Sequence, residues 1–158
     1  QDLGRALVSL LLRGLTIMVA YALFVGITLP QSGGQWLALG MALGLGWLIS
    51  FAWRFLVNLA AFWTPNALGV GRFAFVSSWF LSGFLMPIRF FPAWFVWLAH
   101  LTPFPHTVNT LVEVYLGVLT GPALLQALLG QVLWVVILAI IGQLVLRAGV
   151  RKLVIQGG

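Results

Sequence analysis

Cysteine is absent from this chain, and acidic residues are almost absent. Asp2 and Glu113 are the only carboxylate side chains among 158 residues, and charged residues make up 6% of the sequence, against about 25% in an ordinary soluble domain. Without cysteine the chain has no disulfide, no thiolate metal site and no Cys nucleophile. A soluble domain needs polar groups over its exposed surface, and 62% hydrophobic residues are too many for a disordered chain. The composition predicts an integral membrane protein.

The few charges that are present are mostly positive. Eight Lys and Arg residues give a net charge of +6, which in a soluble protein would suggest a nucleic-acid partner. Here the basic residues are spread through apolar sequence, which is typical of the bias that orients membrane helices. We therefore expect a lipid bilayer and no nucleic acid as the partner of this chain.

Long uncharged apolar runs predict a single transmembrane domain over residues 1–158. Four spans fit, at about residues 6–29, 36–62, 68–87 and 122–146, since one helical crossing takes about 20 residues. Turn-forming residues at positions 30–34 separate the first two spans. The last span ends in a basic segment at residues 147–152.

The segment between the third and fourth spans is rich in proline and aromatic residues. Two short helices fit there, at about residues 92–102 and 106–116, and Pro92 suits the first position of the first helix. Each would be about 16 Å long, which is too short to cross about 30 Å of hydrocarbon. We therefore expect a pair of re-entrant helices before the last span.

Helical spacing places polar residues on one face of the second short helix: His106, Asn109, Thr110 and Glu113. We expect this face to point at water, in a cavity or in the headgroup layer. A proton relay and a metal site are the alternatives, although His106 and Glu113 lie two turns apart, which is wide for shared ligation. We predict no catalytic, cofactor-binding or metal-binding residue.

The basic residues also predict the orientation. With a cytoplasmic N-terminus and four spans, only Arg89 lies outside, and the positive-inside rule is obeyed. Both ends of the chain are then cytoplasmic. The basic residues on or near that side are Arg5, Arg13, Arg54, Arg72, Arg147, Arg151 and Lys152.

Small residues recur every four positions in the second and third apolar runs, which lets helix backbones approach closely. Packing within the chain and a dimer face are both open interpretations. One series is Ala38, Ala42, Gly46 and Ser50. The candidate packing face comprises Gly40, Gly44, Gly46, Ser78 and Ser82.

A polar stripe at i, i+4 and i+8 crosses the second run: Ser50, Arg54 and Asn58. An arginine within a span is a candidate functional residue. Arg54 is either an anchor that snorkels to the headgroups or a contact inside the bundle near a transport route.

Short motifs follow one another in a fixed order through the proline-rich segment: Ser82-Gly83-Phe84-Leu85-Met86-Pro87, Phe91-Pro92-Ala93-Trp94, Thr102-Pro103-Phe104 and Tyr115-Leu116-Gly117. In this order they resemble the membrane component, or permease, of ABC-2-type transporters. The similarity is greatest to a bacterial branch that carries Phe-Trp before the third run, here Phe62-Trp63, and often ends in Gln-Gly-Gly, here residues 156–158. The resemblance covers residues 62–158 well and the first two spans loosely.

The resemblance implies an all-α integral membrane fold, an ABC-2-type helical bundle in which the re-entrant pair forms an outer gate. The family fold has six spans, so this chain would hold the C-terminal four, with the first two spans and the coupling helix before Gln1. The candidate gate residues are Pro87, Pro92, Trp94, Pro103 and Glu113.

The function implied is that of a permease subunit of an ATP-driven exporter in the bacterial cytoplasmic (inner) membrane, forming half of the substrate route. Its partners would be ABC ATP-binding subunits and a second permease, identical or related. ATP and Mg would bind to the ATP-binding subunits, so this chain would bind no cofactor and would not be an enzyme by itself. Two alternatives are a channel or secondary transporter subunit, which should show more buried carboxylates, and a non-transporting membrane assembly subunit.

Overall fold

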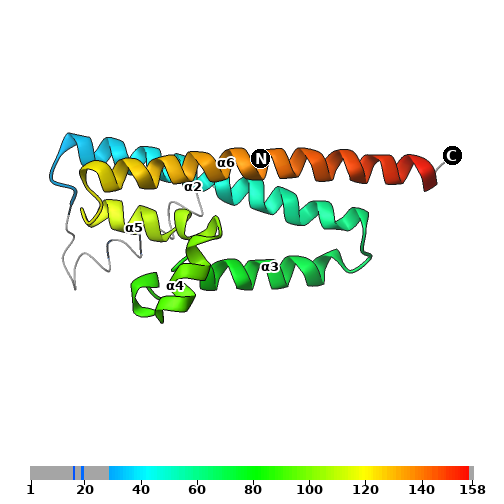
Figure 1. Cartoon of the computed structure of the whole chain (residues 1–158), viewed down its shortest axis with the longest axis horizontal. Coiled ribbons are helices and arrows are strands. Elements are labelled where there is room, and N and C mark those ends of the chain that lie inside the picture. Colours follow the sequence, from blue (N-terminus) through cyan, green and yellow to red (C-terminus); the bar gives the residue numbers. More distant parts are fainter. Residues whose placement is uncertain (1–15, 17–18, 20–28, 157–158) are drawn as a thin grey trace.

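The computed structural model describes residues 16, 19 and 29–156, and every regular element in residues 29–156 is a helix (Figure 1). The prediction of an all-α fold is confirmed for this part of the chain. The predicted first span, at residues 6–29, lies almost wholly outside the described residues. The elements are α2 (Gly33–Asn58), η1 (Leu59–Phe62), α3 (Ala67–Leu81), η2 (Ile88–Phe90), α4 (Ala93–His100), η3 (Phe104–His106), α5 (Asn109–Tyr115) and α6 (Gly121–Gln156).

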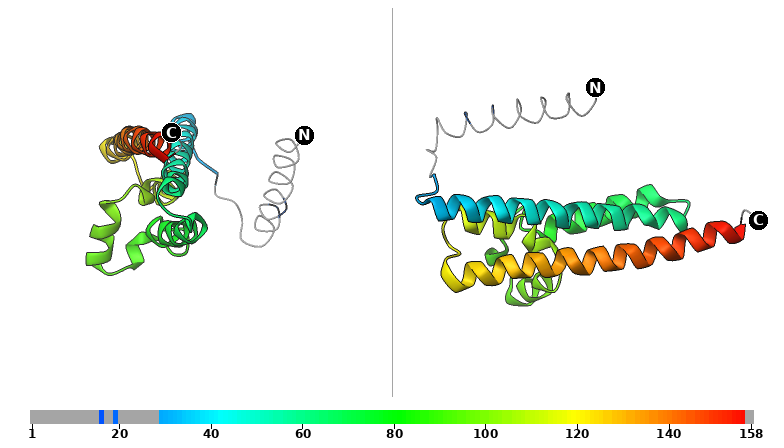
Figure 2. Two further views of the ribbon diagram at one scale, coloured as in Figure 1. Left: turned by 90° about the vertical axis from the view of Figure 1, so that its right-hand side faces the viewer. Right: turned by 90° about the horizontal axis from the view of Figure 1, so that it is seen from above.

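The two long helices, α2 and α6, lie side by side and run in the same direction (Figures 1 and 2). The backbone N–H of Gln35 donates to the Ser32 hydroxyl, which caps the start of α2. Among residues 29–156, two helical stretches are long and apolar enough to cross a membrane, Gly33–Phe62 and Gly121–Lys152. Because they are parallel, their N-terminal ends lie at one end of the bundle and their C-terminal ends at the other.

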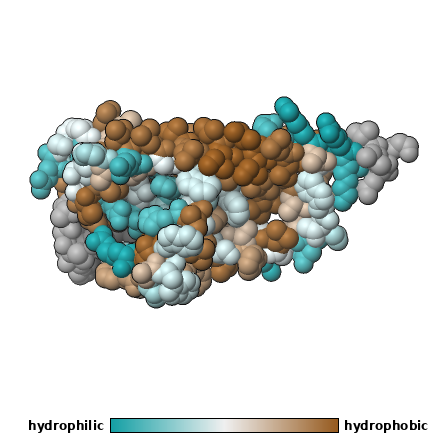
Figure 3. All heavy atoms as spheres, in the orientation of Figure 1, coloured by the Kyte–Doolittle hydropathy of each residue, from teal (hydrophilic) through white to brown (hydrophobic). Residues whose placement is uncertain are grey.

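Helix α6 is longer than the sequence suggested. It continues ten residues beyond the predicted end at position 146 and reaches Gln156. Its 36 residues correspond to about 54 Å, well over the hydrocarbon thickness of about 30 Å. The basic residues Arg147, Arg151 and Lys152 therefore lie on a helical extension. Figure 3 shows an apolar band along α6 between hydrophilic ends.

Helix α3 is shorter than the predicted span at residues 68–87, because it ends at Leu81. Gly83 takes a positive φ of 79°, a left-handed conformation that glycine adopts without strain. The backbone N–H of Phe84 then donates to the Ser82 hydroxyl at 3.3 Å, which fixes the turn. The 15 residues of α3 reach about 22 Å, so this helix by itself is too short to cross the hydrocarbon.

The segment between α3 and α6 contains the two predicted short helices, each a little shorter than expected. Pro92 stands at the N-cap of α4, which ends at His100, and α5 covers residues 109–115 in place of 106–116. The short helix η3 lies between them and follows Pro103. Gly117, with φ of 69°, terminates α5 and leads the chain toward α6.

Burial is concentrated where α2, α5 and α6 meet. Ala38, Ala42 and Val114 form the buried cluster there, and Ile49 and Ile88 are also buried, while many other large apolar side chains are turned outward. Phe73 on α3 is 77% exposed and Trp47 on α2 is 67% exposed. Small residues inside and large apolar residues outside are the distribution expected of a bundle whose outer surface meets lipid.

Candidate functional site

Two glycines let η3 pack directly against both long helices. A Cβ atom on Gly46 of α2 would lie 3.2 Å from the carbonyl oxygen of Thr107 and 3.3 Å from that of His106. A Cβ atom on Gly130 of α6 would lie 2.8 Å from His106 Cε1. Side chains at these positions would push the three segments apart. We call the contact of Ala42, Gly46, His106, Gly130 and Gln131 the junction.

Gln131 supplies the hydrogen bonds of the junction. Its side chain is fully buried, and its Nε2 donates to the carbonyl oxygens of Ala42 at 3.0 Å and His106 at 2.8 Å. One side chain of α6 therefore links α2 and η3. Sequence reasoning missed this residue. The feature that could have identified it is an amide side chain within the long apolar run of the last helix, because polar side chains in such runs commonly form hydrogen bonds between helices.

The imidazole of His106 lies half-buried in the junction, against Gly130. Its Nδ1 and the Oε1 of Gln131 are both buried without a hydrogen-bond partner in the described structure. No group of three metal-binding side chains occurs in the described residues, so the metal alternative for His106 and Glu113 gains no support there.

The expectation of a water-facing polar side on the second short helix is wrong. Thr110 is only 5% exposed, and Asn109 Oδ1 accepts from the backbone N–H of Ile88 at 3.4 Å. His106 and Glu113 are half-buried. Asn109 and Thr110 therefore pack against the rest of the chain together with the apolar Val114, while Val112, at 41% exposure, faces outward.

Asn109 also accounts for the first proline-rich motif. Its backbone N–H donates to the Ser82 carbonyl oxygen at 3.1 Å, and its side chain lies against Gly83 and Ile88. The end of α3, η2 and the start of α5 are therefore held together around one asparagine.

Gln35 ties the start of α2 to the end of α5. Its Nε2 donates to the carbonyl oxygens of Val114 at 3.2 Å and Tyr115 at 2.9 Å. Carbonyl groups in the last turn of a helix lack partners within the helix, so this side chain acts as a cap supplied from elsewhere. A shift of α2 would therefore carry α5 with it.

The five candidate gate residues are spread along the connection from α3 to α6. Pro92 begins α4, and Pro103 is buried before η3. Pro87 is exposed and Trp94 is 67% exposed, while Glu113 is half-buried. No hydrogen bond or ring contact joins any two of them within residues 29–156. Three prolines shape the segment, but the five do not form one cluster.

The candidate packing face divides into two parts. Gly46 and Ser82 are buried, and Ser78 lies half-buried between α2 and α3. Gly40 and Gly44 are exposed, and a Cβ atom at either position would meet no described atom within 4 Å. On α2, the series that includes Ala38, Ala42 and Gly46 packs against other described residues, whereas Gly40 and Gly44 do not.

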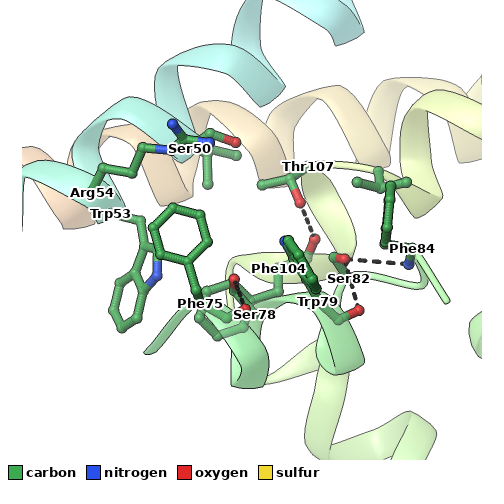
Figure 4. Close-up of a pocket in the computed structure, with 12 residues that line it drawn as sticks. Ser50, Trp53, Arg54, Phe75, Ser78, Trp79, Ser82, Phe84, Phe104 and Thr107 are labelled. Atoms are coloured by element: carbon green, nitrogen blue, oxygen red, sulfur yellow. Dashed lines mark hydrogen bonds between the residues drawn. The ribbon is translucent and has the colours of Figure 1, made fainter. Parts of the chain in front are cut away.

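The residues of the polar stripe line a groove between α2 and α3, which we call the α2–α3 groove. Its first cavity, of about 180 Å³, lies among Ser50 and Arg54 of α2 and Phe75 and Ser78 of α3 (Figure 4). The Arg54 Cζ lies 5.1 Å from the centroid of the Phe75 ring, a cation–π contact. Asn58, one turn further along α2, borders a neighbouring cavity of about 240 Å³ together with Arg54.

The α2–α3 groove carries positive charge, and no described residue supplies a counter-charge to it. Glu113, in α5, is the single acidic residue of the described chain, and Arg54 makes no ion pair or hydrogen bond with any described residue. The Ser50 hydroxyl is likewise without a hydrogen bond in this part of the chain. The groove therefore presents free donors beside aromatic side chains.

Comparison with known proteins identifies the family. The model of one protein family, described as ABC-2 family transporter protein, matches residues 3–157. No curated protein and no solved structure matches the chain. The match extends over almost the whole sequence, including both long apolar helices and the proline-rich segment between them. The chain therefore belongs to the ABC-2 family of transporter proteins, as a permease component embedded in the membrane.

Proposed function

We propose that this chain is one permease half of an ATP-driven exporter and that two such halves enclose the substrate route. The family match over residues 3–157 carries this proposal. The exposed glycines support it, because Gly40 and Gly44 leave a face of α2 on which a second permease, identical or related, could approach closely. The described cavities lie at the outside of this chain's own bundle, where a partner could complete them.

ATP and Mg would bind to separate ABC ATP-binding subunits on the cytoplasmic side of a bacterial inner membrane. The positive-inside rule places the α2–α3 connection and the end of α6 on that side, with both ends of the chain cytoplasmic. The helical extension with Arg147, Arg151 and Lys152 would then project toward the ATP-binding subunits. Binding of ATP would bias the permease pair between two arrangements.

The segment α4–η3–α5 would act as the outer gate, dipping into the outer leaflet without crossing it. Two contacts support coupling of this segment to the long helices. Gln35 joins α5 to α2, and Gln131 joins η3 to both α2 and α6. A change in the relative positions of α2 and α6 would therefore be transmitted to the gate directly through these hydrogen bonds.

Isolation of the complex from its native membrane tests the proposal. A tagged permease, extracted in mild detergent, should co-purify with a subunit that binds nucleotide, and the complex should hydrolyse ATP in a vanadate-sensitive manner. Its mass should correspond to two permeases and two ATP-binding subunits. Recovery of the permease without any nucleotide-binding subunit would contradict the proposal.

Substitution of Glu113 distinguishes this proposal from proton-coupled transport, since a secondary transporter would depend on a carboxylate within the membrane. Glu113→Gln should leave assembly intact and change transport at most moderately. Abolished transport by a normally assembled Glu113→Gln complex would favour the channel or secondary-transporter alternative.

A further inference from the structure

The α2–α3 groove leads from the end of α2 into the middle of the bundle. Helices α2 and α3 run in opposite directions (Figure 1), so Asn58 of α2 and Gly71 of α3 border the same cavity, of about 240 Å³. Arg54 and Phe75 line this cavity and also the one at Ser50, of about 180 Å³. The two cavities are therefore neighbours, and Arg54 lies where they meet.

The cavity at Ser50 lies well inside the membrane. The stretch Gly33–Phe62 has 30 residues, or about 45 Å of helix against about 30 Å of hydrocarbon. Centred on the hydrocarbon, this helix would leave it near Val57, so Arg54 would lie about 5 Å and Ser50 about 10 Å inside. The cavity at Asn58 would then open at the hydrocarbon boundary, and the groove would lead inward from there.

The lining of this deeper cavity is polar. Arg54 and Ser50 have no hydrogen-bond partner among the described residues. The hydroxyl groups of Ser78, Ser82 and Thr107 each donate to a carbonyl oxygen three residues earlier, at 2.7, 3.1 and 2.6 Å, which leaves each oxygen with capacity to accept. The cavity therefore offers both donors and acceptors, and such groups are costly to leave unsatisfied in an apolar medium.

Irregular backbone also borders the deeper cavity. Ser82 follows the end of α3, and Thr107 and Val108 connect η3 to α5. The backbone N–H of Val108 donates no hydrogen bond within the described chain. At membrane depth, non-helical backbone is tolerated only where it is buried in protein or lines a water-filled cavity. A charged side chain within a span follows the same rule, and Arg54 is such a side chain.

We propose that the α2–α3 groove is a water-filled vestibule, open at Asn58 and closed at η3, that admits hydrophilic anions in preference to cations. The deeper cavity has room for several water molecules, because one needs about 10–15 Å³ and about two to four polar partners. Arg54 gives the preference for anions, since no described residue supplies a counter-charge to it. The proposal rests on the membrane location of the chain and not on ATP or a second permease. It can therefore fail while the exporter function holds, and the reverse is also true.

Cysteine labelling in membrane vesicles of known orientation tests the proposal, since the full chain has no native cysteine. Methanethiosulfonates react with the ionised thiol, which forms in water and not in lipid. Ser50→Cys should react with impermeant sulfonate and quaternary-ammonium reagents applied on the side from which Arg151→Cys reacts. Leu48→Cys is the matched control and should stay unreactive. Leu48 is 41% exposed and points about 200° away from Ser50 around the same helix, so its thiol should meet lipid.

The two reagents also measure the charge preference. Relative to their rates with a free thiol in solution, the sulfonate should react with Ser50→Cys faster than the quaternary ammonium. Adding Arg54→Gln should lower this anion-to-cation ratio about fivefold or more, because it removes a unit charge one helical turn from the thiol. Arg147→Gln removes the same charge from the exposed face of α6, outside the groove, and should leave the ratio unchanged. If the Arg54→Gln chain does not fold, the ratio for Ser50→Cys should still fall as salt concentration rises.

A second pair of variants tests the entrance without changing any charge. Gly71 lines the cavity at Asn58, and a Cβ atom on Gly71 would meet no described atom within 4 Å. Gly71→Trp should therefore fill the entrance without disturbing the fold, and labelling of Ser50→Cys by both reagents should be lost. Gly40 is equally open but lies outside the groove, so Gly40→Trp should leave the labelling unchanged.

Three results would overturn the proposal. The first is a reactivity of Ser50→Cys no greater than that of Leu48→Cys, which would show that lipid or another protein segment fills the groove. The second is an anion-to-cation ratio that Arg54→Gln does not change, which would remove the charge preference. The third is reaction of Ser50→Cys only from the side opposite to Arg151→Cys, which would place the opening at the other end of the bundle.

Discussion

The junction and the α2–α3 groove both belong to α2, yet the two are packed in opposite ways. At the junction, Gly46 allows the backbone of α2 to contact the backbone at His106 and Thr107. Gln131 donates both amide hydrogens to the carbonyl groups of Ala42 and His106. In the groove, Arg54 and Ser50 have no partner among the described residues, and apolar side chains such as Phe73 are exposed. One side of α2 is therefore packed by the described residues of this chain, whereas the groove side is left open by them.

The comparison also suggests which parts move together. Gln35 and Gln131 fasten α5 and η3 to the long helices, while α3 meets α2 across cavities. The edge-to-face contact of Trp53 with Phe104, at 5.0 Å between ring centroids, is where the groove borders η3. We expect α2, α5, η3 and α6 to shift as one body and α3 to adjust beside them.

The largest expected effect is in cysteine labelling from outside the cell, where each position is either labelled or not. The result shows on which side of the membrane the α2–α3 groove lies. The chain lacks native cysteine, so single cysteines can be labelled without background. In intact cells, an impermeant thiol reagent should label Ser32→Cys and Arg89→Cys but not Arg151→Cys. Labelling of Arg151→Cys from outside would contradict the predicted orientation and would place Arg54 on the outer side of the membrane.

The next largest effect separates the two sides of α2. Gly46→Leu should lower the free energy of unfolding by about 3 kcal/mol, because the new side chain meets backbone oxygens that cannot move aside. Gly44→Leu is the matched control, and it should change stability by less than about 0.5 kcal/mol in the isolated chain. Thermal unfolding in detergent measures both, and equal losses would mean that the two sides are packed alike.

Gly44→Leu has a second use in the assembled complex. If a second permease approaches this face, as proposed, the variant should reduce recovery of the complex while the melting temperature of the isolated chain stays the same. Normal assembly of Gly44→Leu would show that this face of α2 meets lipid.

A smaller effect is expected from the buried amide. Gln131→Leu should cost about 1 kcal/mol, a common value for a hydrogen bond between membrane helices, because two interhelical bonds are lost while the apolar replacement fills part of the space. Gln126→Leu, on the exposed side of the same helix, should cost little in the same thermal measurement. A stable Gln131→Leu chain would mean that backbone packing alone holds the junction.

The smallest effect is expected in the groove. Arg54→Gln should change the free energy of unfolding by about 0.5 kcal/mol, the value of an exposed cation–π contact with Phe75. Thermal unfolding in lipid-free detergent is the measurement. A loss of several kcal/mol would instead make Arg54 a structural anchor of the chain.

Composition and local sequence were sufficient for several features. An apolar chain with two acidic residues predicts a membrane protein, because charges are costly in hydrocarbon. Proline and glycine act on the nearest few backbone bonds, so Pro92 marked the start of the first short helix to within one residue. The order of such motifs led to the ABC-2 family, which the family match confirms.

Tertiary structure decided which of the equivalent positions are used. Gly44 and Gly46 both belong to four-residue repeats, yet they point about 200° apart around the helix, and only contact with η3 shows that Gly46 is the packed one. Gln126, Gln131 and Gln143 all lie in α6, but the carbonyl groups of Ala42 and His106 select Gln131. Asn109 packs inward for the same reason, since its partners Ser82 and Ile88 are far away in the sequence. Local periodicity gives a helix its faces, and only the neighbouring segments determine which face is buried.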